Sequence, residues 1–519
     1  MTREVVRAGL LVAAEEASAV VVRSSHSTFI QEGADACAAI LDPAGQLVAQ
    51  SVATTLTHSC SLRCSLPELL AVFPLASLRP GDVLATNDPY RGGIHANDIL
   101  VFEPVFAGET VILFTGTLIH VADIGGAVAG GLAAVATDTF SEGVLLPPVK
   151  LFDAGARVQP VWDIIAANSR TPDKVIGDVH GLVAGARVMR RRVEELCDQW
   201  GADTVVQVAS DWLDEAERRM REELAALPDG TWTGGYGIET DGVTDRTFDV
   251  HATVTIDGDR CVIDFAGTSA QSGGAINSSV SQTLSGVLFA VRCFVDPTIP
   301  MNEGCLRPLE VHLPEGSLVN PRPPAACGGR IVTVAACIEA IIEALGGARP
   351  ELATAASGLV HVYTIAGSTP SPWVTLLYDF GGLGARNGSD GPDATGVFFL
   401  GGRSVVPQVE PLEIAHPVLF RHARLRDGSG GEGRWRGGRG IELAIEALEP
   451  CVVTVRGDRM KTPPAGRAGG SPGAPGYNAV QRRDGTIEPL APKQANIPLA
   501  AGEVLLLATS GGGGYGSRS

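Results

Sequence analysis

The sequence predicts a mixed α/β (α+β), multidomain protein that is rich in strands. With 519 residues, the chain is too long for one hydrophobic core and suggests roughly three or four packed units. Apolar residues make up 45% and charged residues 19%, a balance that supplies buried cores and gives no sign of general disorder. The 64 glycines and 33 prolines predict many tight turns, so short strands joined by loops compete with helices.

The first quarter of the chain predicts a helix, a hairpin and a turn-rich sheet. Residues 1–24 indicate an amphipathic helix, because two glutamates interrupt the apolar run that a signal peptide would need. Residues 34–50 predict a β-hairpin, since apolar segments flank an Asp-Pro-Ala-Gly turn. The stretch SLPELLAVFP (65–74) predicts a short helix after a capping serine. Residues 79–126 alternate turns with β-rich runs, which favours a sheet whose loops gather at one edge.

The rest of the chain changes from helix to strand. Apolar residues recur at helical spacing from about Gly177 to Leu227, and residues 232–269 carry the Asp-Gly turns of hairpins. Helices are predicted at 280–297 and 331–346, and strands with glycine turns from about Leu400. These patterns divide the chain into an N-terminal α/β region with the candidate metal site (1–176), a central helical tract (177–230), a mixed α/β region (231–400) and a Gly-rich β C-terminal region (401–519).

Charge and hydropathy exclude several classes of function. The formal net charge of −18 repels nucleic acid and anionic lipid, so we expect neither a nucleic-acid partner nor a membrane partner. The longest run of small uncharged residues lies between Asp123 and Asp138 and is too short to span a bilayer. We therefore expect a cytoplasmic protein. Ten cysteines spread over this length do not form a disulfide scaffold, and Cys60 and Cys64 are expected to be buried as small apolar residues.

No motif indicates a nucleotide site on this chain. The phosphate-loop pattern G-x-x-x-x-G-K-[ST] is absent from the sequence. Two G-x-G-x-x-G matches begin at Gly428 and Gly511, but neither follows a strand and opens a helix, so both indicate structural turns. If ATP takes part in the reaction, we expect another chain to hold it.

A nucleophilic residue is not indicated either. There is no G-x-S-x-G elbow. The stretch THSCSL places His58 beside Ser59 and Cys60 in sequence, but catalytic triads are defined by geometry, and neighbours in sequence need not meet in space.

Two H-x-x-D units carry the strongest chemical signal. His95 and Asp98 lie at the start of a predicted strand, after a turn (87–93) that aims it, and His120 and Asp123 repeat the spacing twenty-five positions later. On paired strands, two such units converge and offer imidazole nitrogens and carboxylate oxygens to a divalent metal. The pattern by itself leaves two readings open, a metal site and hydrogen-bonded polar residues at a strand edge.

Motifs along nearly the whole chain, from about residue 5 to 516, resemble the hydantoinase B/oxoprolinase family. The stretches that carry the resemblance, in order, are NDPYRGGIHANDI, HVADIGG, EGVLLPPVKL, NEGCLRPLEV, GSLVNPRPPAA, GGEGRWRGGRG, GDRMKTPPAGRAGGSPGAPG and SGGGGYG. The family includes B subunits of N-methylhydantoinases, the corresponding half of ATP-dependent 5-oxoprolinases, caprolactamases, and subunits of acetone and acetophenone carboxylases.

The resemblance implies a metal site and a partner. His95, Asp98 and His120 match the family's ligands for a divalent metal, for which zinc, manganese and iron are the candidates. Asp35 corresponds to a further ligand or orienting group, although the family more often has Glu-Arg-Arg-Asp there. Asp123 is the other candidate for orienting a ligand histidine, and either aspartate is a candidate for aligning proton transfers. Arg330 and Arg459 either meet an anionic substrate or form ordinary salt bridges.

The resemblance also implies the reaction. An ATP-binding subunit of hydantoinase A/oxoprolinase type phosphorylates the amide oxygen of a small cyclic amide, and the metal site of this chain hydrolyses the activated ring. The implied assembly is a hetero-oligomer such as a dimer of heterodimers. The alternatives are a subunit of an ATP-dependent ketone (acetone or acetophenone) carboxylase, a non-catalytic partner that stabilises the ATP-binding subunit, and a stand-alone metal-dependent hydrolase.

Overall fold

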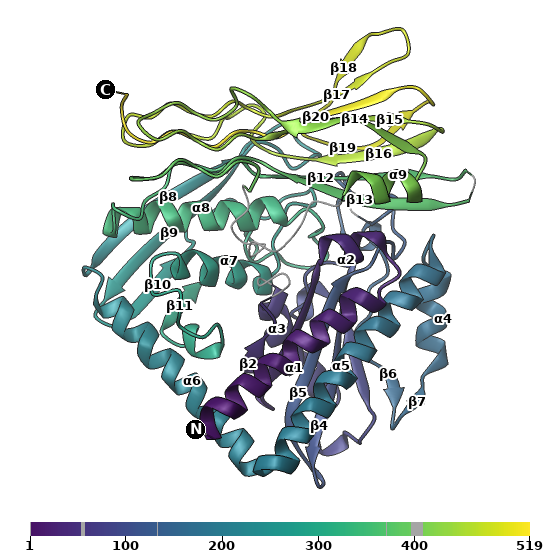
Figure 1. Ribbon diagram of the computed structural model, residues 1–519, viewed down its shortest axis with the longest axis vertical. Helices are drawn as coiled ribbons and strands as arrows, with labels where there is room; N and C mark the ends of the chain where they lie inside the picture. The colour runs from purple at the N-terminus through teal and green to yellow at the C-terminus, as the bar shows by residue number, and fades with distance from the viewer. Residues whose placement is uncertain (1, 53–57, 132, 370, 396–407, 519) are drawn as a thin grey trace.

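The computed structural model describes residues 2–52, 58–131, 133–369, 371–395 and 408–518, and it confirms the mixed α/β, multidomain class. Within these residues the strands form four sheets. Figure 1 shows a lower body, which contains the N-terminal sheet and most of the helices, below the C-terminal strands.

The N-terminal unit is built on a seven-stranded sheet in the order β2-β1-β5-β4-β3-β6-β7. Its strands are β1 (Ala36–Leu41), β2 (Leu47–Gln50), β3 (Val83–Thr86), β4 (Asp98–Ala107), β5 (Thr110–His120), β6 (Val149–Asp153) and β7 (Ala156–Arg157). The antiparallel pairing of β1 with β2 confirms the predicted hairpin. Most residues of β4 are buried on both sides of the strand, because helices cover both faces of this sheet.

Helices α1 (Thr2–Ser24) and α5 (Pro172–Trp200) lie side by side on one face of the sheet (Figure 1). Helix α3 (Ser59–Val72) packs on the other face, where Leu62, Leu66 and Leu69 form its buried stripe. The helix predicted at 65–74 therefore begins six residues earlier, and Ser65 is a buried residue inside it and does not cap it. The buried stripe extends back beyond Ser65, so the 3.6-residue spacing of apolar residues indicates the start of this helix better than the serine does.

The predicted central helical tract is two helices. Helix α5 begins five residues before Gly177, and Gly201, with φ of 83°, separates it from α6 (Ala202–Ala225). Glycine adopts this left-handed backbone without strain, so the chain turns there. Three further helices are shorter: α2 (Thr28–Gly33), α4 (Gln159–Ala167) and α9 (Val409–Ala415).

The second unit is a four-stranded sheet with two helices, of which one packs on the strands and the other packs on the first helix. Its strands, in the order β11-β10-β9-β8, are β8 (Gly230–Ile238), β9 (Phe248–Asp257), β10 (Arg260–Asp264) and β11 (Leu309–His312). The helices α7 (Val280–Arg292) and α8 (Ile331–Ala348) are those predicted, although α7 ends five residues earlier. Helix α8 has the length and mean hydropathy (1.8) of a membrane span, but 72% of it is buried, and it packs on β8, β9 and α7 as a core helix.

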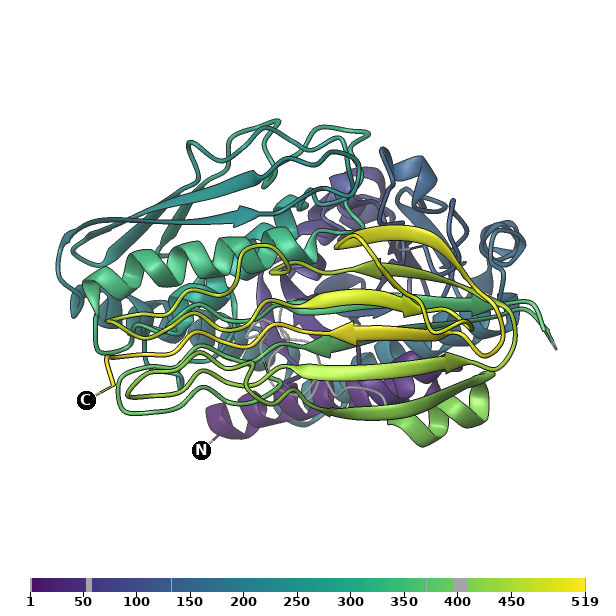
Figure 2. The same cartoon turned by 90° about the horizontal axis from the view of Figure 1, so that it is seen from above.

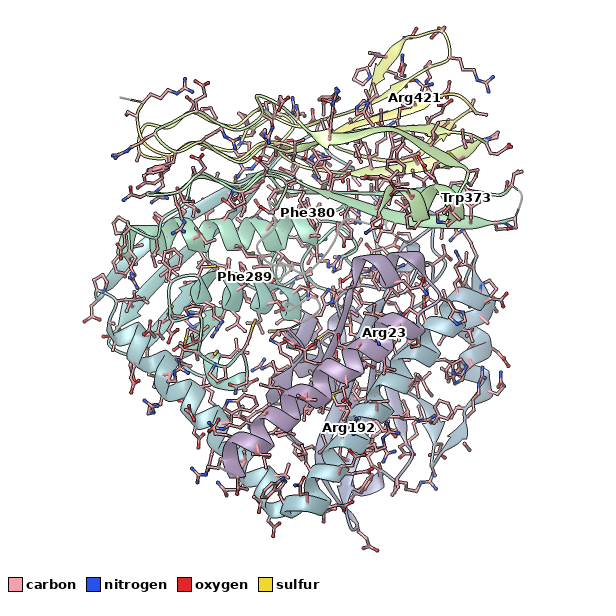
Figure 3. All side chains as sticks on the ribbon, in the orientation of Figure 1. Arg23, Arg192, Phe289, Trp373, Phe380 and Arg421 are labelled. Atoms are coloured by element: carbon pink, nitrogen blue, oxygen red, sulfur yellow. The ribbon has the colours of Figure 1, made fainter. Side chains whose placement is uncertain are left out.

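The C-terminal unit is a sandwich of two sheets around one hydrophobic core. One sheet contains β13 (Trp373–Phe380), β12 (Val360–Gly367), β16 (Cys451–Arg456) and β19 (Lys493–Leu499); the other contains β14 (Val418–Leu425), β15 (Ile441–Ala447), β20 (Val504–Ala508), β17 (Tyr477–Gln481) and β18 (Ile487–Pro489). Trp373 and Phe380 mark the two ends of β13 (Figure 3). The predicted boundary at 400–401 lies outside the described residues, but β12 pairs with β16, so we propose that this unit begins near Val360.

The glycine-rich segments of this unit are mainly extended chains and not turns. Residues 381–391, 429–440, 465–474 and 510–516 run side by side beyond the sandwich, as the wavy parallel traces in Figure 2 show. Their N–H groups donate to carbonyls of neighbouring segments, for example Gly382 to Ser510 and Gly512 to Gly438. A Cβ at Gly382 would lie 1.8 Å from the Gly438 oxygen. Glycine is therefore required there for close packing of the backbones.

Candidate metal centre

The candidate site lies where three adjacent strands of the N-terminal sheet meet at one end. Asp98 opens β4, His120 closes β5, and the two residues face each other directly in the antiparallel register. Asp35 precedes β1, and its carbonyl accepts a hydrogen bond of 3.4 Å from the His120 N–H. One residue from each H-x-x-D unit, Asp98 and His120, thus lies opposite the other on neighbouring strands.

The loop before β4 is held rigidly, which places His95. The Asn87 side chain donates to the carbonyls of Ala96 and Val144 and accepts from the Leu146 N–H. Gly92 has φ of 82°, and a Cβ there would lie 2.4 Å from the Cys64 carbonyl carbon, so the turn packs directly on α3. A glycine is required at this contact.

The ligand atoms of His95, Asp98 and His120 converge. One nitrogen or oxygen from each lies within 4.8 Å of the others, and the side chains are 1%, 0% and 4% exposed. The distances to the Asp98 oxygens are 3.0 Å from His95 Nε2 and 3.3 Å from His120 Nδ1, yet neither oxygen of Asp98 makes a hydrogen bond within the described residues. Ligands about 2.0–2.1 Å from a shared tetrahedral ion lie roughly 3.3 Å apart. These buried atoms therefore fit a divalent metal.

The electrostatics favour the forms that bind a metal. Burial lowers the pKa of His95 to about 3, so its imidazole is neutral at pH 7. Burial opposes charge on Asp98, but the two histidines and Arg330 hold the pKa of this carboxyl well below its usual range. Neutral imidazole and ionised carboxylate are the states that coordinate metals.

Asp35 and His58 form the next layer of the site. The Asp35 carboxylate lies 3.6 Å from His58 Nε2, and His58 is 2% exposed at the start of α3. Within the described residues, the group that offers convergent ligand atoms does not include Asp35. His58 was recognised in the sequence only as a neighbour of Ser59 and Cys60, because its proximity to Asp35 is created by the packing of α3 on the sheet.

Arg330 borders the site, and Arg456, from a distant strand, lies near Arg330. Arg330, at the start of α8, places Nη2 3.7 Å from an oxygen of Asp98. Arg456 on β16 is 5% exposed, and its guanidinium donates to the Gly328 carbonyl. Burial and nearby Arg330 lower the pKa of Arg456 to about 9, so it is charged at neutral pH. Nothing in the sequence singled out Arg456.

Glu142 lies near both arginines. Its carboxylate accepts hydrogen bonds from the Cys327 and Gly328 N–H groups at 3.1 and 2.5 Å. Burial raises the pKa of Glu142 to about 7, although both hydrogen bonds and Arg456 favour the charged form. Arg459, for which the sequence left open an anion contact or an ordinary salt bridge, stacks over Tyr236, with Cζ 4.1 Å from the ring centroid.

The thiols next to the site are poor nucleophiles. All ten cysteines are free, and Cys60 is 1% exposed. Burial raises the pKa of Cys60 to about 12, so its thiol is protonated at neutral pH.

Asp123 holds the loop that follows β5. One carboxylate oxygen accepts from the Gly125 and Arg170 N–H groups, and the other accepts from the Gly130 N–H and the Arg170 guanidinium at 2.9 Å. Both oxygens are therefore engaged in the loop.

Because its contacts are structural, we expect Asp123→Asn to lower the free energy of unfolding by about 1–3 kcal/mol and to leave the metal content unchanged. Chemical denaturation and metal analysis of the purified protein measure the two effects. A loss of metal in Asp123→Asn would instead support the role of orienting a ligand histidine.

Comparison with known proteins yields one family over the whole chain. A sequence model described as hydantoinase B/oxoprolinase matches residues 1–518. The caprolactamase subunit beta of Pseudomonas jessenii is 31% identical over 478 residues, which cover 90% of this chain and 82% of that protein.

Two solved structures share the fold. The ATP-dependent caprolactamase from Pseudomonas jessenii superimposes with a TM-score of 0.92 and 28% identity, covering 99% of this chain and 91% of that one. A nucleotide-free acetone carboxylase gives a TM-score of 0.89 at 19% identity, covering 99% of this chain and 75% of that one. At this identity the second likeness shows the fold alone.

Proposed function

Since the chain belongs to the hydantoinase B/oxoprolinase family, we propose that it is the B-type subunit of an ATP-dependent enzyme that hydrolyses a cyclic amide, such as a hydantoin, 5-oxoproline or a lactam. The observation that carries the proposal is the buried convergence of His95, Asp98 and His120 at the end of β4 and β5. The Asp98 oxygens and His95 Nε2 make no hydrogen bond within the described residues, and unpaired buried polar atoms of this kind are costly in a purely structural cluster.

The chemistry requires activation by a partner. A ring amide is stabilised by resonance and reacts slowly with water, so a phosphoryl group on its oxygen is needed to make that oxygen a leaving group. The sequence lacks a phosphate loop, and the ATP site is therefore assigned to a subunit of hydantoinase A/oxoprolinase type. The proposed assembly is a hetero-oligomer of the two chains.

The residues of this chain have separate roles. His95, Asp98 and His120 hold the divalent ion, with Asp35 as a fourth ligand or as the acceptor of a proton from water. When bound, such an ion supplies Lewis acidity for hydrolysis. His58, 3.6 Å from Asp35, orients this carboxylate. Asp123 keeps the loop after β5 in place.

The two arginines are assigned to the phosphoryl group of the activated substrate. A divalent ion bound beside Asp98 would neutralise the charge of this carboxylate. The positive charges of Arg330 and Arg456 would then exceed the negative charge of the other carboxylates nearby. A dianionic group is the complement of such an excess, and guanidinium groups bind phosphate oxygens in pairs. This arrangement places the leaving group on the α8 side of the site.

We expect Arg330→Met to weaken inhibition by inorganic phosphate about tenfold, because one charge-assisted hydrogen bond is lost, and to leave the metal content intact. Arg349→Met is the matched control, since Arg349 is at the other end of α8 and pairs with Glu351. Inhibition constants of the assembled enzyme measure the effect. Loss of metal in Arg330→Met would show that Arg330 serves Asp98 and not the anion.

Co-expression with an A-type subunit tests the function. ATP turnover is compared with hydantoins, 5-oxoproline and lactams on one side, and with ketones plus bicarbonate on the other. Stimulation by ring amides is expected. Stimulation by ketones alone would assign the chain to the carboxylase alternative, and the absence of stoichiometric metal would leave it a non-catalytic partner.

A further inference from the structure

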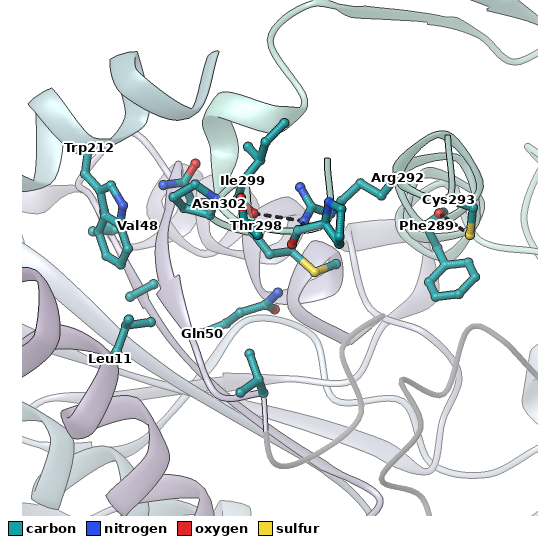
Figure 4. A pocket seen from close by; sticks show the side chains of 15 residues that line it. Leu11, Val48, Gln50, Trp212, Phe289, Arg292, Cys293, Thr298, Ile299 and Asn302 are labelled. Carbon is teal, nitrogen blue, oxygen red and sulfur yellow. Dashed lines mark hydrogen bonds between the residues drawn. The ribbon is translucent and has the colours of Figure 1, made fainter. Parts of the chain in front are cut away.

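A cavity lies at the edge of the N-terminal sheet, between that sheet and the loop after α7. Its volume is about 490 Å³, and Figure 4 shows the residues around it. Apolar side chains form most of the wall, among them Leu11, Val48, Trp212, Phe289 and Ile299. A cavity of this size at the contact of two structural units is typical of a small-molecule site.

The Gln50 side chain in this cavity has no partner within the described residues. Gln50 ends β2 and is 2% exposed, and neither its amide nitrogen nor its amide oxygen makes a hydrogen bond. Figure 4 shows this side chain in the space between Trp212 and Phe289. A buried amide with both groups unpaired is rare and requires an explanation.

A second unpaired amide lines the same cavity. Asn302 is 1% exposed; its oxygen accepts from the Gly304 N–H, while its nitrogen has no partner within the described residues. Arg292 also lines the cavity, and its guanidinium donates to the carbonyls of Pro297 and Ile299 and to the Cys305 sulfur. The unpaired polar groups on the cavity wall are therefore the side-chain amide nitrogens of Gln50 and Asn302, which are donors, and the amide oxygen of Gln50, which is an acceptor.

The cavity is separate from the candidate metal centre but close to it. Gln50 pairs with Ala39 on β1, three residues along the strand from Ala36, which pairs with Ile119 beside His120. At about 3.3 Å per residue, this separation is roughly 10 Å along the strands, and the step from β2 to β5 across β1 adds roughly 10 Å across the sheet.

We propose that this cavity is a second small-molecule site, which binds a planar ring amide through two parallel hydrogen bonds to the side chain of Gln50. In a ring amide the N–H and the C=O stand on the same edge, the mirror of the donor and acceptor of a glutamine amide. The apolar wall accommodates the ring methylenes. The choice of a ring amide rests on the proposed function, and the site would hold the ring before it is phosphorylated, since Arg292, the charged side chain on the wall, already donates to protein carbonyls and to the Cys305 sulfur.

The test measures binding of a six-membered lactam and of its N-methyl derivative to the full chain, by ligand-observed NMR. The His120→Ala background disables the metal centre, so binding there reports on the cavity alone. We expect the lactam to bind with a dissociation constant of about 1 mM in both backgrounds, and the N-methyl derivative at least about tenfold more weakly, because it lacks the N–H.

Gln50→Leu is expected to reduce lactam affinity at least about tenfold and to make the two ligands equal. Met301→Trp, which fills the cavity from a half-buried loop position, is the second variant and should also block binding if Gln50→Leu fails to fold. Equal binding of the two ligands to the unmodified chain, or lactam binding that is lost in His120→Ala and kept in Gln50→Leu, would overturn the proposal. Neither result would touch the proposed hydrolysis, whose failure is seen in metal content and ATP turnover.

Discussion

Replacement of His120 by alanine is expected to release the metal and abolish turnover. His120 Nδ1 faces Asp98 directly across the β4–β5 ladder, so its loss removes one of three converging ligands from a buried site. We expect the metal content to fall from about one ion per chain to less than about 0.1, and turnover to fall about 10³-fold or more, since Lewis-acid catalysis contributes several kcal/mol. Elemental analysis of the purified chain and ATP turnover of the assembled enzyme measure the two effects.

The matched control is His312→Ala on β11. This histidine is half-exposed and pairs with Glu310, far in sequence from the candidate ligands, so metal content and turnover should remain unchanged. Asp35→Asn extends the series, and a partial loss of metal is expected if Asp35 is a fourth ligand. Retention of a full metal complement by His120→Ala would refute the assignment of the site.

A second large effect is expected from Gly382→Ala in the glycine-rich C-terminal unit. The added Cβ would lie 1.8 Å from the Gly438 oxygen, which already accepts a hydrogen bond from the Gly512 N–H. The carbonyl cannot retreat without breaking that bond. We expect the free energy of unfolding to fall by about 3 kcal/mol or more, which corresponds to a fall of roughly 6–12 °C in the thermal midpoint for a unit of this size.

Gly273→Ala provides the control, because a Cβ there meets nothing within 4 Å and its backbone is not left-handed. Its thermal midpoint should stay within about 1 °C of the unmodified protein. Scanning calorimetry of both variants and the unmodified chain measures the difference. Equal midpoints for Gly382→Ala and the unmodified protein would mean that the extended segments separate easily, and the close-packing explanation would be wrong.

Local patterns predicted the elements that depend on neighbours in sequence. The hairpin of β1 and β2 and the helices α1, α7 and α8 follow from turn residues and apolar periodicity. The start of α3 was missed because Ser65 has the pattern of a cap although the apolar spacing begins before it, and the break at Gly201 was missed because it depends on the backbone angle of one residue. The glycines from about Leu400 onward indicated turns, whereas the structure uses many of them where extended chains touch.

The sequence by itself determined the family and the three candidate ligands, since the H-x-x-D unit and the second histidine are local motifs whose order along the chain is specific. Only the tertiary structure decided what surrounds them. Arg330, Arg456 and His58 reach the site from helices and strands far apart in the chain, and Gln50 faces a cavity closed by a loop some 250 residues away. Such neighbours are created by the packing of sheets and helices, which no local spacing encodes.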